Sequence, residues 1–260
     1  MTPRIVATDL DGTLLSSTGA ISPRTRDALG RAASGGAEIV FVTARPPRAV
    51  RTVAVQAGVA GTAICSNGAI LYDLATGDVA AAHTLAPDLG ARIAETLAAA
   101  LPGVAFAVET GWEVLAEARY TLHQEDLFRR VPSACGAGEP IVKLLARSAA
   151  HTSDEMLAAA TAAVGGLAEI THSGVAGLLE ISAAGVTKAG TLGRLCAERG
   201  VARHEVVAFG DMPNDLAVLA FAGAGYAMAN AHHLVLAGAA FRTLSNDEDG
   251  VAVVLERLFG

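Results

Sequence analysis

The segment Ile5-Val-Ala-Thr-Asp-Leu-Asp-Gly-Thr-Leu-Leu15 joins a short apolar run to two carboxylates that lie two residues apart. The run ahead of the first carboxylate is typical of a buried strand. Alternate residues of an extended chain point to the same face, so we expect Asp9 and Asp11 side by side at the carboxyl end of this strand. Ligands of open α/β sheets bind at that end. The segment therefore predicts both a parallel sheet and the position of a site.

The sequence around this segment alternates between strand and helix patterns, as in a doubly wound parallel sheet. Ser22 and Pro23, for example, supply an N-cap and a first-turn proline for a helix. The predicted strands are 4–8, 38–42, 62–65, 205–209 and 225–228, and the predicted helices are 23–33, 46–57, 188–199, 214–222 and 247–258. The fold class is therefore α/β, with a Rossmann-like core.

The middle of the chain has a different rhythm. A helix at 87–100 precedes two predicted strands, 104–109 and 112–117, which the turn at Thr110-Gly111 joins into a hairpin. Segments at 140–146, 168–172 and 178–182 and a helix at 153–164 continue a smaller α+β unit. We therefore predict a discontinuous core domain, 1–82 and 184–260, and an inserted domain at 83–183, which could close over a site through its two linkers.

Composition limits the classes of function. The chain has 260 residues, of which 52% are hydrophobic, and a formal net charge of −7, which argues against a nucleic-acid partner. Three cysteines, far apart and without CxxC spacing, predict neither a disulfide framework nor a zinc site, and favour a cytoplasmic location. No apolar run reaches the roughly 18 residues of a membrane span, and no signal-peptide pattern precedes Asp9, so we expect neither export nor a membrane partner.

A second acidic cluster makes the first one informative. A lone Asp-x-Asp pair is most often a helix cap or a solvated turn, but Gly210-Asp-Met-Pro-Asn-Asp215 also follows an apolar run. Two more carboxylates, Asp211 and Asp215, are thus expected at the same edge of the sheet. Neighbouring carboxylates repel one another, and a hard divalent cation with oxygen ligands, such as Mg²⁺, relieves the repulsion.

Two further groups suit an anion. Thr43 ends the second predicted strand with a hydroxyl, and Lys188 begins a predicted helix with an amine. Acids that hold a metal, together with a hydroxyl and a lysine that hold an anion, are typical of a phosphoryl-transfer site.

The ordered motifs resemble the haloacid-dehalogenase (HAD) superfamily of aspartate-nucleophile phosphatases, and within it the Cof-type subfamily, whose large α+β cap is inserted after the third core strand. The resemblance spans the chain. It rests on Asp9-Leu-Asp-Gly-Thr-Leu-Leu15, Thr43, Ser66-Asn-Gly-Ala69, Lys188, Gly210-Asp-Met-Pro-Asn-Asp215, Ala227-Met-Ala-Asn-Ala231 and Asn246-Asp-Glu-Asp-Gly-Val251. Ala44, Ala189 and Ala229 stand where the subfamily often has glycine, which concerns the substrate pocket more than the chemistry.

The resemblance implies a Mg²⁺-dependent phosphatase that acts on small phosphorylated metabolites, such as sugar phosphates, through an aspartyl phosphate. Asp9 would be the nucleophile and Asp11 the general acid and base. The metal would be held by the Asp9 side chain, the Asp11 carbonyl and Asp211, with Asp215 acting through water or by orienting Lys188. The phosphate would be bound by Thr43, Lys188 and Asn214.

Other candidates have plain structural explanations. Arg48 and Arg51 fit a solvated helix face, whereas Arg45 and Asn67 are as well placed to contact substrate as to serve structure. Histidines 83, 151, 204, 232 and 233 have no convincing metal-ligand spacing and receive no role. Polar residues of the inserted domain are substrate-contact candidates, although each one separately is better explained by structure: Trp112, Glu113, His123, Lys143, His172 and Glu180.

Two alternatives remain open from the sequence. A phosphomutase or phosphotransferase would use the same nucleophile and metal but pass the phosphoryl group to a second substrate. A phospho-acceptor receiver domain also combines acids, a threonine and a lysine, but it gives no role to an inserted domain or to Asp11. The physiological substrate and the oligomeric state, monomer or dimer, are not determined by the sequence.

Overall fold

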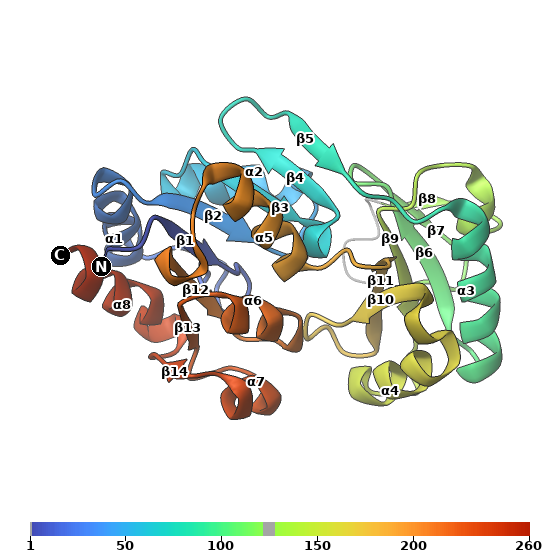
Figure 1. Ribbon diagram of the computed structural model, residues 1–260. Helices are drawn as coiled ribbons and strands as arrows, with labels where there is room; N and C mark the ends of the chain where they lie inside the picture. The colour runs from blue at the N-terminus through green and yellow to red at the C-terminus, as the bar shows by residue number, and fades with distance from the viewer. Residues whose placement is uncertain (1, 122–127) are drawn as a thin grey trace. The chain divides into compact units, whose positions relative to one another are not determined.

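The computed structural model describes residues 2–121 and 128–260, and the chain divides into two compact units. The core unit runs up to Ala81 and again from Lys188 to Gly260, and the inserted unit comprises Ala82–Thr187. Each unit has its own sheet (Figure 1). His123, one of the substrate-contact candidates, lies outside the described residues.

The core unit contains a sheet in the order β14-β13-β12-β1-β2-β3-β4-β5. The strands from β14 to β3 are paired in parallel, and β4 pairs antiparallel to β3. Their bounds are β1 Ile5–Thr8, β2 Glu38–Val42, β3 Thr62–Cys65, β4 Ile70–Asp73, β5 Val79–Ala82, β12 Val206–Gly210, β13 Ala224–Ala227 and β14 Phe241–Arg242. All four residues of β1 are buried, as expected for a central strand covered on both faces. The prediction of an α/β fold with a parallel core sheet is confirmed.

Six helices belong to the core unit among the described residues. They are α1 Pro23–Ser34, α2 Pro47–Ala57, α5 Lys188–Arg199, α6 Leu216–Phe221, α7 His233–Gly238 and α8 Gly250–Phe259. Helix α1 begins as the sequence predicts, because the Ser22 hydroxyl accepts a hydrogen bond from the Thr25 amide and Pro23 occupies the first turn. Helix α1 packs against α8, and α5 packs against α6.

In its described part, the inserted unit has a mixed sheet in the order β10-β11-β9-β6-β7-β8 and two α-helices, α3 and α4. Its elements are α3 Pro87–Ala100, β6 Ala105–Glu109, β7 Val114–Ala116, β8 Phe128–Arg130, β9 Lys143–Arg147, α4 Ser153–Val164, β10 Ala168–Thr171 and β11 Leu178–Ala183. Strands β6 and β7 form the predicted antiparallel hairpin. One sheet face shares a buried hydrophobic cluster with α3 and α4, which includes Ile93 of α3, Met156 of α4 and Leu144 of β9.

The structure corrects two helix boundaries. The predicted helix 247–258 begins only at Gly250, because Asp249 adopts a left-handed conformation (φ 58°) that interrupts helical geometry. The predicted helix 214–222 is a 3₁₀ turn, Pro213–Asp215, followed by α6. No prediction was made for α7 or for the strands β4, β5, β8 and β14, which have at most six residues each. No helix in the described part of the chain is both long and apolar enough to cross a membrane.

Candidate active site

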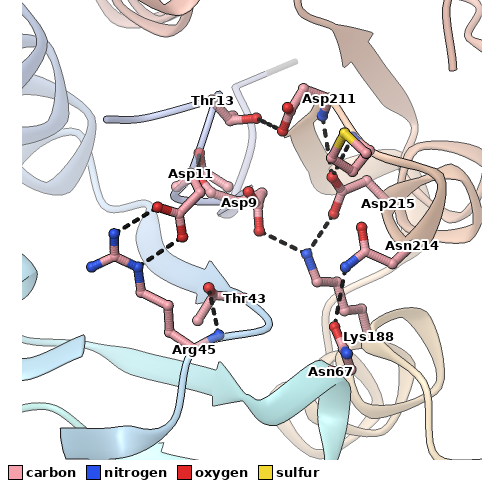
Figure 2. A network of polar contacts seen from close by, with 12 residues as sticks. Asp9, Asp11, Thr13, Thr43, Arg45, Asn67, Lys188, Asp211, Asn214 and Asp215 are labelled. Carbon is pink, nitrogen blue, oxygen red and sulfur yellow. Dashed lines mark hydrogen bonds and ion pairs between the residues drawn. The ribbon is translucent and has the colours of Figure 1, made fainter. Parts of the chain in front are cut away.

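Parallel pairing in the core unit brings the carboxyl ends of three strands to one edge of the sheet. Thr8, the last residue of β1, is in register with Phe41 of β2 on one side and with Phe209 of β12 on the other. Asp9, Thr43 and Asp211 each directly follow one of these strands. Figure 2 shows the polar side chains that gather at this edge.

Lys188, the first residue of α5, bridges two of the carboxylates. Its Nζ lies 2.7 Å from Asp9 Oδ1 and 2.7 Å from Asp215 Oδ1 (Figure 2). All three side chains are buried. Burial alone would lower the pKa of Lys188, but the charges of Asp215 and Asp9 raise it above its ordinary value, so the amine is protonated.

Asp211 is the third buried carboxylate of the group. Oxygen atoms of Asp9, Asp211 and Asp215 all lie within 4.8 Å of one another. The Thr13 hydroxyl donates to Asp211 Oδ1 at 2.9 Å, and the backbone amides of Asp211 and Met212 donate to Asp215 Oδ2 at 3.1 Å each. The three carboxylates are therefore fixed by specific hydrogen bonds.

The crowding of these acids changes their proton affinity. Burial, with the neighbouring charge of Asp215, raises the pKa of Asp211 to about 7. Burial also raises the pKa of Asp9 well above its ordinary value, although Lys188 partly opposes this effect. One lysine does not neutralise three carboxylates, so this group favours the binding of a proton or a cation.

Gly12 makes this close approach possible. Its φ of +73° is disfavoured for other residues, and a Cβ atom there would overlap the Asp211 carboxylate. The Asp-x-Asp-Gly pattern therefore requires glycine for both its backbone angle and the space next to the acid.

Asp11 lies apart from this carboxylate group. Its side chain is 59% exposed and accepts two hydrogen bonds from Arg45, at 2.6 and 2.7 Å (Figure 2). Arg45 belongs to the loop that follows β2, and its hydrogen bonds with Asp11 raise its own pKa. Asp9 and Asp11 are therefore neighbours in the chain but lie in different environments. Asp9 is buried, and Asp11 is exposed to solvent.

Three more predicted residues line the same region (Figure 2). Thr43 is buried, and its hydroxyl accepts a hydrogen bond from the Arg45 amide at 3.1 Å. Asn214 Nδ2 donates to Asn67 Oδ1 at 3.1 Å. Asn67 Nδ2 and Asn214 Oδ1 are both buried and have no hydrogen-bond partner, which is unusual for buried amides and is typical of groups that contact a ligand or water. Asn67 also adopts a left-handed conformation, φ 57°.

The remaining candidates lie elsewhere. Arg48 is half-buried and Arg51 is exposed on α2. In the inserted unit Trp112 is 56% exposed, Glu113 pairs with Arg129 at 3.0 Å, and His172 Nε2 lies 3.0 Å from Asp154. Lys143 and Glu180 belong to a separate buried ion cluster. The cysteines, Cys65, Cys135 and Cys196, are buried, and none of them forms a disulfide within the described residues.

The sequence reasoning did not give Thr13 a role, although its hydroxyl holds Asp211. The signal was present, because Thr13 stands in the same strand-to-turn segment as the two aspartates. A hydrogen bond to a residue 198 positions later, however, is not predictable from local sequence.

The donor set fits a hard divalent cation. Asp9, Asp211 and Asp215 are buried, are close enough to share one ion and carry oxygen ligands of the type Mg²⁺ prefers. A bound cation would oppose the rise in the pKa values of Asp9 and Asp211, because its charge stabilises the ionised form of these buried carboxylates.

Comparison with known proteins identifies the class. The family model of the haloacid dehalogenase-like hydrolases matches residues 6–255, and the chain belongs to this family. The match covers both units, so the predicted resemblance is confirmed, as is the prediction of an enzyme of the hydrolase class.

Particular relatives carry phosphatase names, which support a phosphatase. The chain is 29% identical to the 5-amino-6-(5-phospho-D-ribitylamino)uracil phosphatase YitU of Bacillus subtilis, with 99% of this chain and 98% of the relative covered. It is 28% identical to the pyridoxal phosphate phosphatase YbhA of Escherichia coli, with 97% of each covered. Among solved structures, a haloacid dehalogenase-like hydrolase from B. subtilis superposes with a TM-score of 0.85 at 25% identity, covering 98% of this chain and 99% of that one.

Proposed function

We propose that this protein is a Mg²⁺-dependent phosphatase that hydrolyses small phosphorylated metabolites through an aspartyl phosphate on Asp9. The observation that carries the proposal is the buried group of Asp9, Asp211 and Asp215 with Lys188 at 2.7 Å from two of its members. It combines a carboxylate nucleophile, oxygen ligands for a cation and a fixed positive charge for a phosphoryl group.

Asp9 acts as the nucleophile. A carboxylate needs no separate base once it is ionised, and Lys188 together with a bound cation favours the ionised form against the effect of burial. Attack on phosphorus forms an acyl phosphate bond at the Asp9 carboxylate and releases the alcohol as the leaving group. Water then attacks phosphorus, breaks that bond and regenerates Asp9.

Asp11 supplies and removes the protons. It is two residues from the nucleophile, exposed and outside the carboxylate group, so it can reach a leaving oxygen without competing for a cation. To act as an acid it must first take up a proton, and the two hydrogen bonds from Arg45 favour its carboxylate form. We therefore assign to Arg45 a second partner, a substrate oxygen, whose binding loosens its contact with Asp11.

The cation would be held by the side chains of Asp9 and Asp211 and by the Asp11 carbonyl, while Asp215 orients Lys188 and accepts backbone hydrogen bonds. Bound Mg²⁺ supplies charge neutralisation for the phosphoryl oxygens. The same phosphoryl oxygens are bound by Thr43, Lys188 and the side-chain amides of Asn67 and Asn214. This role agrees with Asn67 Nδ2, which has no hydrogen-bond partner.

Substrate choice belongs to the inserted unit, which we propose acts as a cap. The relatives named above act on a phosphorylated ribitylamino-uracil and on pyridoxal phosphate, both compact molecules. We extend this class, a phosphate monoester on a small polar metabolite, to the present chain, and we propose the cytoplasm as its location.

The test is release of inorganic phosphate from sugar phosphates, nucleotides, pyridoxal phosphate and an aryl phosphate, with Mg²⁺ and with chelator. Metal-dependent release from at least one compound is expected. Release that persists in chelator would contradict the metal requirement. If folded protein with Mg²⁺ transferred phosphoryl groups between sugar positions without releasing phosphate, the mutase alternative would replace the proposal.

The role of Asp11 has its own test. Asp11→Asn should lower kcat by about 10²-fold or more for an alkyl phosphate, and much less for an aryl phosphate whose leaving group needs no proton. An equal loss for both substrates would contradict the assignment of Asp11 as the acid.

A further inference from the structure

Two asparagine side chains hold the turn that carries Asp11. This catalytic turn, residues 10–15, follows β1 directly. Asn230 Nδ2 donates a hydrogen bond to the carbonyl of Gly12 at 2.8 Å, and Asn246 Nδ2 donates to the carbonyl of Leu15 at 2.8 Å. The two asparagines are also joined to each other, because the backbone amide of Asn246 donates a hydrogen bond to Asn230 Oδ1 at 3.0 Å.

The catalytic turn has few bonds of its own. Within it the amides of Leu15 and Thr13 donate to the Leu10 carbonyl, at 2.8 and 3.4 Å, and Asp11 and Leu15 form one isolated bridge. Gly12, at its centre, has a positive φ and the freedom of a residue without a side chain. The side-chain amides of Asn230 and Asn246 thus hold the turn at two backbone carbonyls, one on each side of Thr13.

The position of the turn sets the position of two functional groups. Asp11 precedes Gly12, and Thr13 follows it and donates to Asp211. A shift of the Gly12 peptide would therefore displace the Asp11 side chain and the hydroxyl that orients Asp211. Misplacement of a reacting group by about 1 Å can cost about 10²-fold in rate.

The segment that supplies Asn246 is itself firmly attached. Ser245 and Glu248 form a reciprocal capping pair around the 3₁₀ turn Asn246–Glu248. Asp249, in its left-handed conformation, accepts hydrogen bonds from the hydroxyls of Ser22 and Thr25, at 2.6 and 3.0 Å. Asn246 thus extends from a fixed segment.

We propose that Asn230 and Asn246 are positioning residues that hold the catalytic turn in the geometry that Asp11 needs to protonate the leaving group. The inference rests on the phosphatase function proposed above. It gives a physical role to two asparagines that lie more than 200 residues from the turn in sequence and that touch neither the carboxylate group nor Lys188 in the described contacts.

The first test is Asn230→Ala, because Asn230 is exposed and its removal leaves the core intact. For an alkyl phosphate, kcat should fall by about 10- to 100-fold with little change in KM, whereas for an aryl phosphate kcat should fall less than about threefold. Asn230→Asp keeps the acceptor for Asn246 but removes the donor to Gly12, so it should behave like Asn230→Ala. Asn246→Ala should do the same, and the double variant should cost little more than either single one.

A second readout does not depend on activity. Amide hydrogen exchange of the peptide that contains residues 10–15 should become at least about tenfold faster in Asn230→Ala, while the exchange of β2 and β3 stays unchanged. If the wild-type protein releases no phosphate, the proposed function fails, and exchange alone decides whether the asparagines hold the turn.

Arg203→Ala is the matched control, since it removes side-chain hydrogen bonds of the core unit, to the Phe221 and Ala220 carbonyls, without touching the catalytic turn or either asparagine. It should lower stability, but the ratio of aryl to alkyl kcat should remain that of the wild type. The proposal is overturned if Asn230→Ala leaves exchange of residues 10–15 unchanged. It is equally overturned if Asn230→Ala and Arg203→Ala lower both kcat values by the same factor.

Discussion

Both units of the molecule bury a lysine between two carboxylates, but they balance its charge differently. In the core unit Lys188 lies 2.7 Å from both Asp9 and Asp215. In the inserted unit Lys143 lies 2.7 Å from Glu180 and 3.5 Å from Glu109, and all three side chains are at most 5% exposed. By these contacts alone the two clusters look equivalent.

Their surroundings separate them. Asp211 adds a third carboxylate to the core cluster and leaves it with excess negative charge. In the inserted unit a second positive charge, that of Arg147, lies in the same region, since Arg147, Glu180 and Glu109 all act on the pKa of the buried Tyr120. The inserted cluster is balanced and stabilises its sheet, whereas the core cluster remains unbalanced until a cation or a proton binds. Excess charge, rather than burial, distinguishes the candidate functional cluster.

The largest expected effect is on the proposed nucleophile, Asp9. Asp9→Asn keeps the size of the side chain but removes the attacking carboxylate, so kcat should fall by about 10⁴-fold or more. Phosphate release measures the loss, and circular dichroism with thermal unfolding checks that the fold is retained. Activity above about 1% of the wild type would exclude Asp9 as the nucleophile.

The inserted cluster should respond in stability. Lys143→Met leaves Glu109 and Glu180 buried without their cation, and breaking a buried ion pair in this way costs about 3–5 kcal/mol. Urea unfolding followed by a probe in the inserted unit measures this loss. A loss below about 1 kcal/mol would mean that the two glutamates take up protons or reach water, and that the cluster is not balanced as described.

The comparison also predicts a pH dependence for the metal-free protein. The folded pKa of Asp211, about 7, lies above its ordinary value of 3.8, and that of Asp9 is raised in the same direction. Between about pH 4 and pH 7 the folded protein therefore holds protons that the unfolded chain has released, so stability decreases as pH rises through this window. The decrease should be on the order of a few kcal/mol.

Urea unfolding in chelator at pH 5, 6, 7 and 8 tests this dependence. Asp211→Asn is the matched variant, and its stability should depend less steeply on pH because it lacks the titrating group. Mg²⁺ should stabilise the wild type more at pH 8 than at pH 5, because it competes with protons for the same oxygens. Parallel curves for the wild type and Asp211→Asn would contradict the raised pKa of Asp211.

The sequence predicts the core sheet well because local signals and topology agree there. The apolar run before Asp9 and the capped start of α1 each specify one structure. β4 and β5 escaped prediction because they are short and leave side chains partly or largely exposed, without a strong apolar pattern. The late start of α8 depends on the conformation of Asp249, which contacts with Ser22 and Thr25 stabilise.

The candidate site divides in the same way. Residue types and the positions of strand ends are enough to predict that one site contains Asp9, Lys188, Asp211 and Asp215. The pairing of Arg45 with Asp11, rather than with an anion, was not predictable, because it depends on how two loops approach each other in space. The balanced cluster around Lys143 was equally hidden, since its members come from three strands that pair out of sequence order.

The smallest expected effect provides the control for the buried lysines. Glu113 and Arg129 form a two-fold hydrogen-bonded ion pair in the inserted unit, but both side chains are more than 40% exposed. Water and salt already solvate such charges, so their attraction adds little. Glu113→Gln should leave the free energy of unfolding unchanged within error, both at low salt and at high salt. A loss of stability as large as that of Lys143→Met would mean that the geometry of an ion pair, and not its burial, decides its strength. The comparison of the two buried clusters would then no longer follow from their burial.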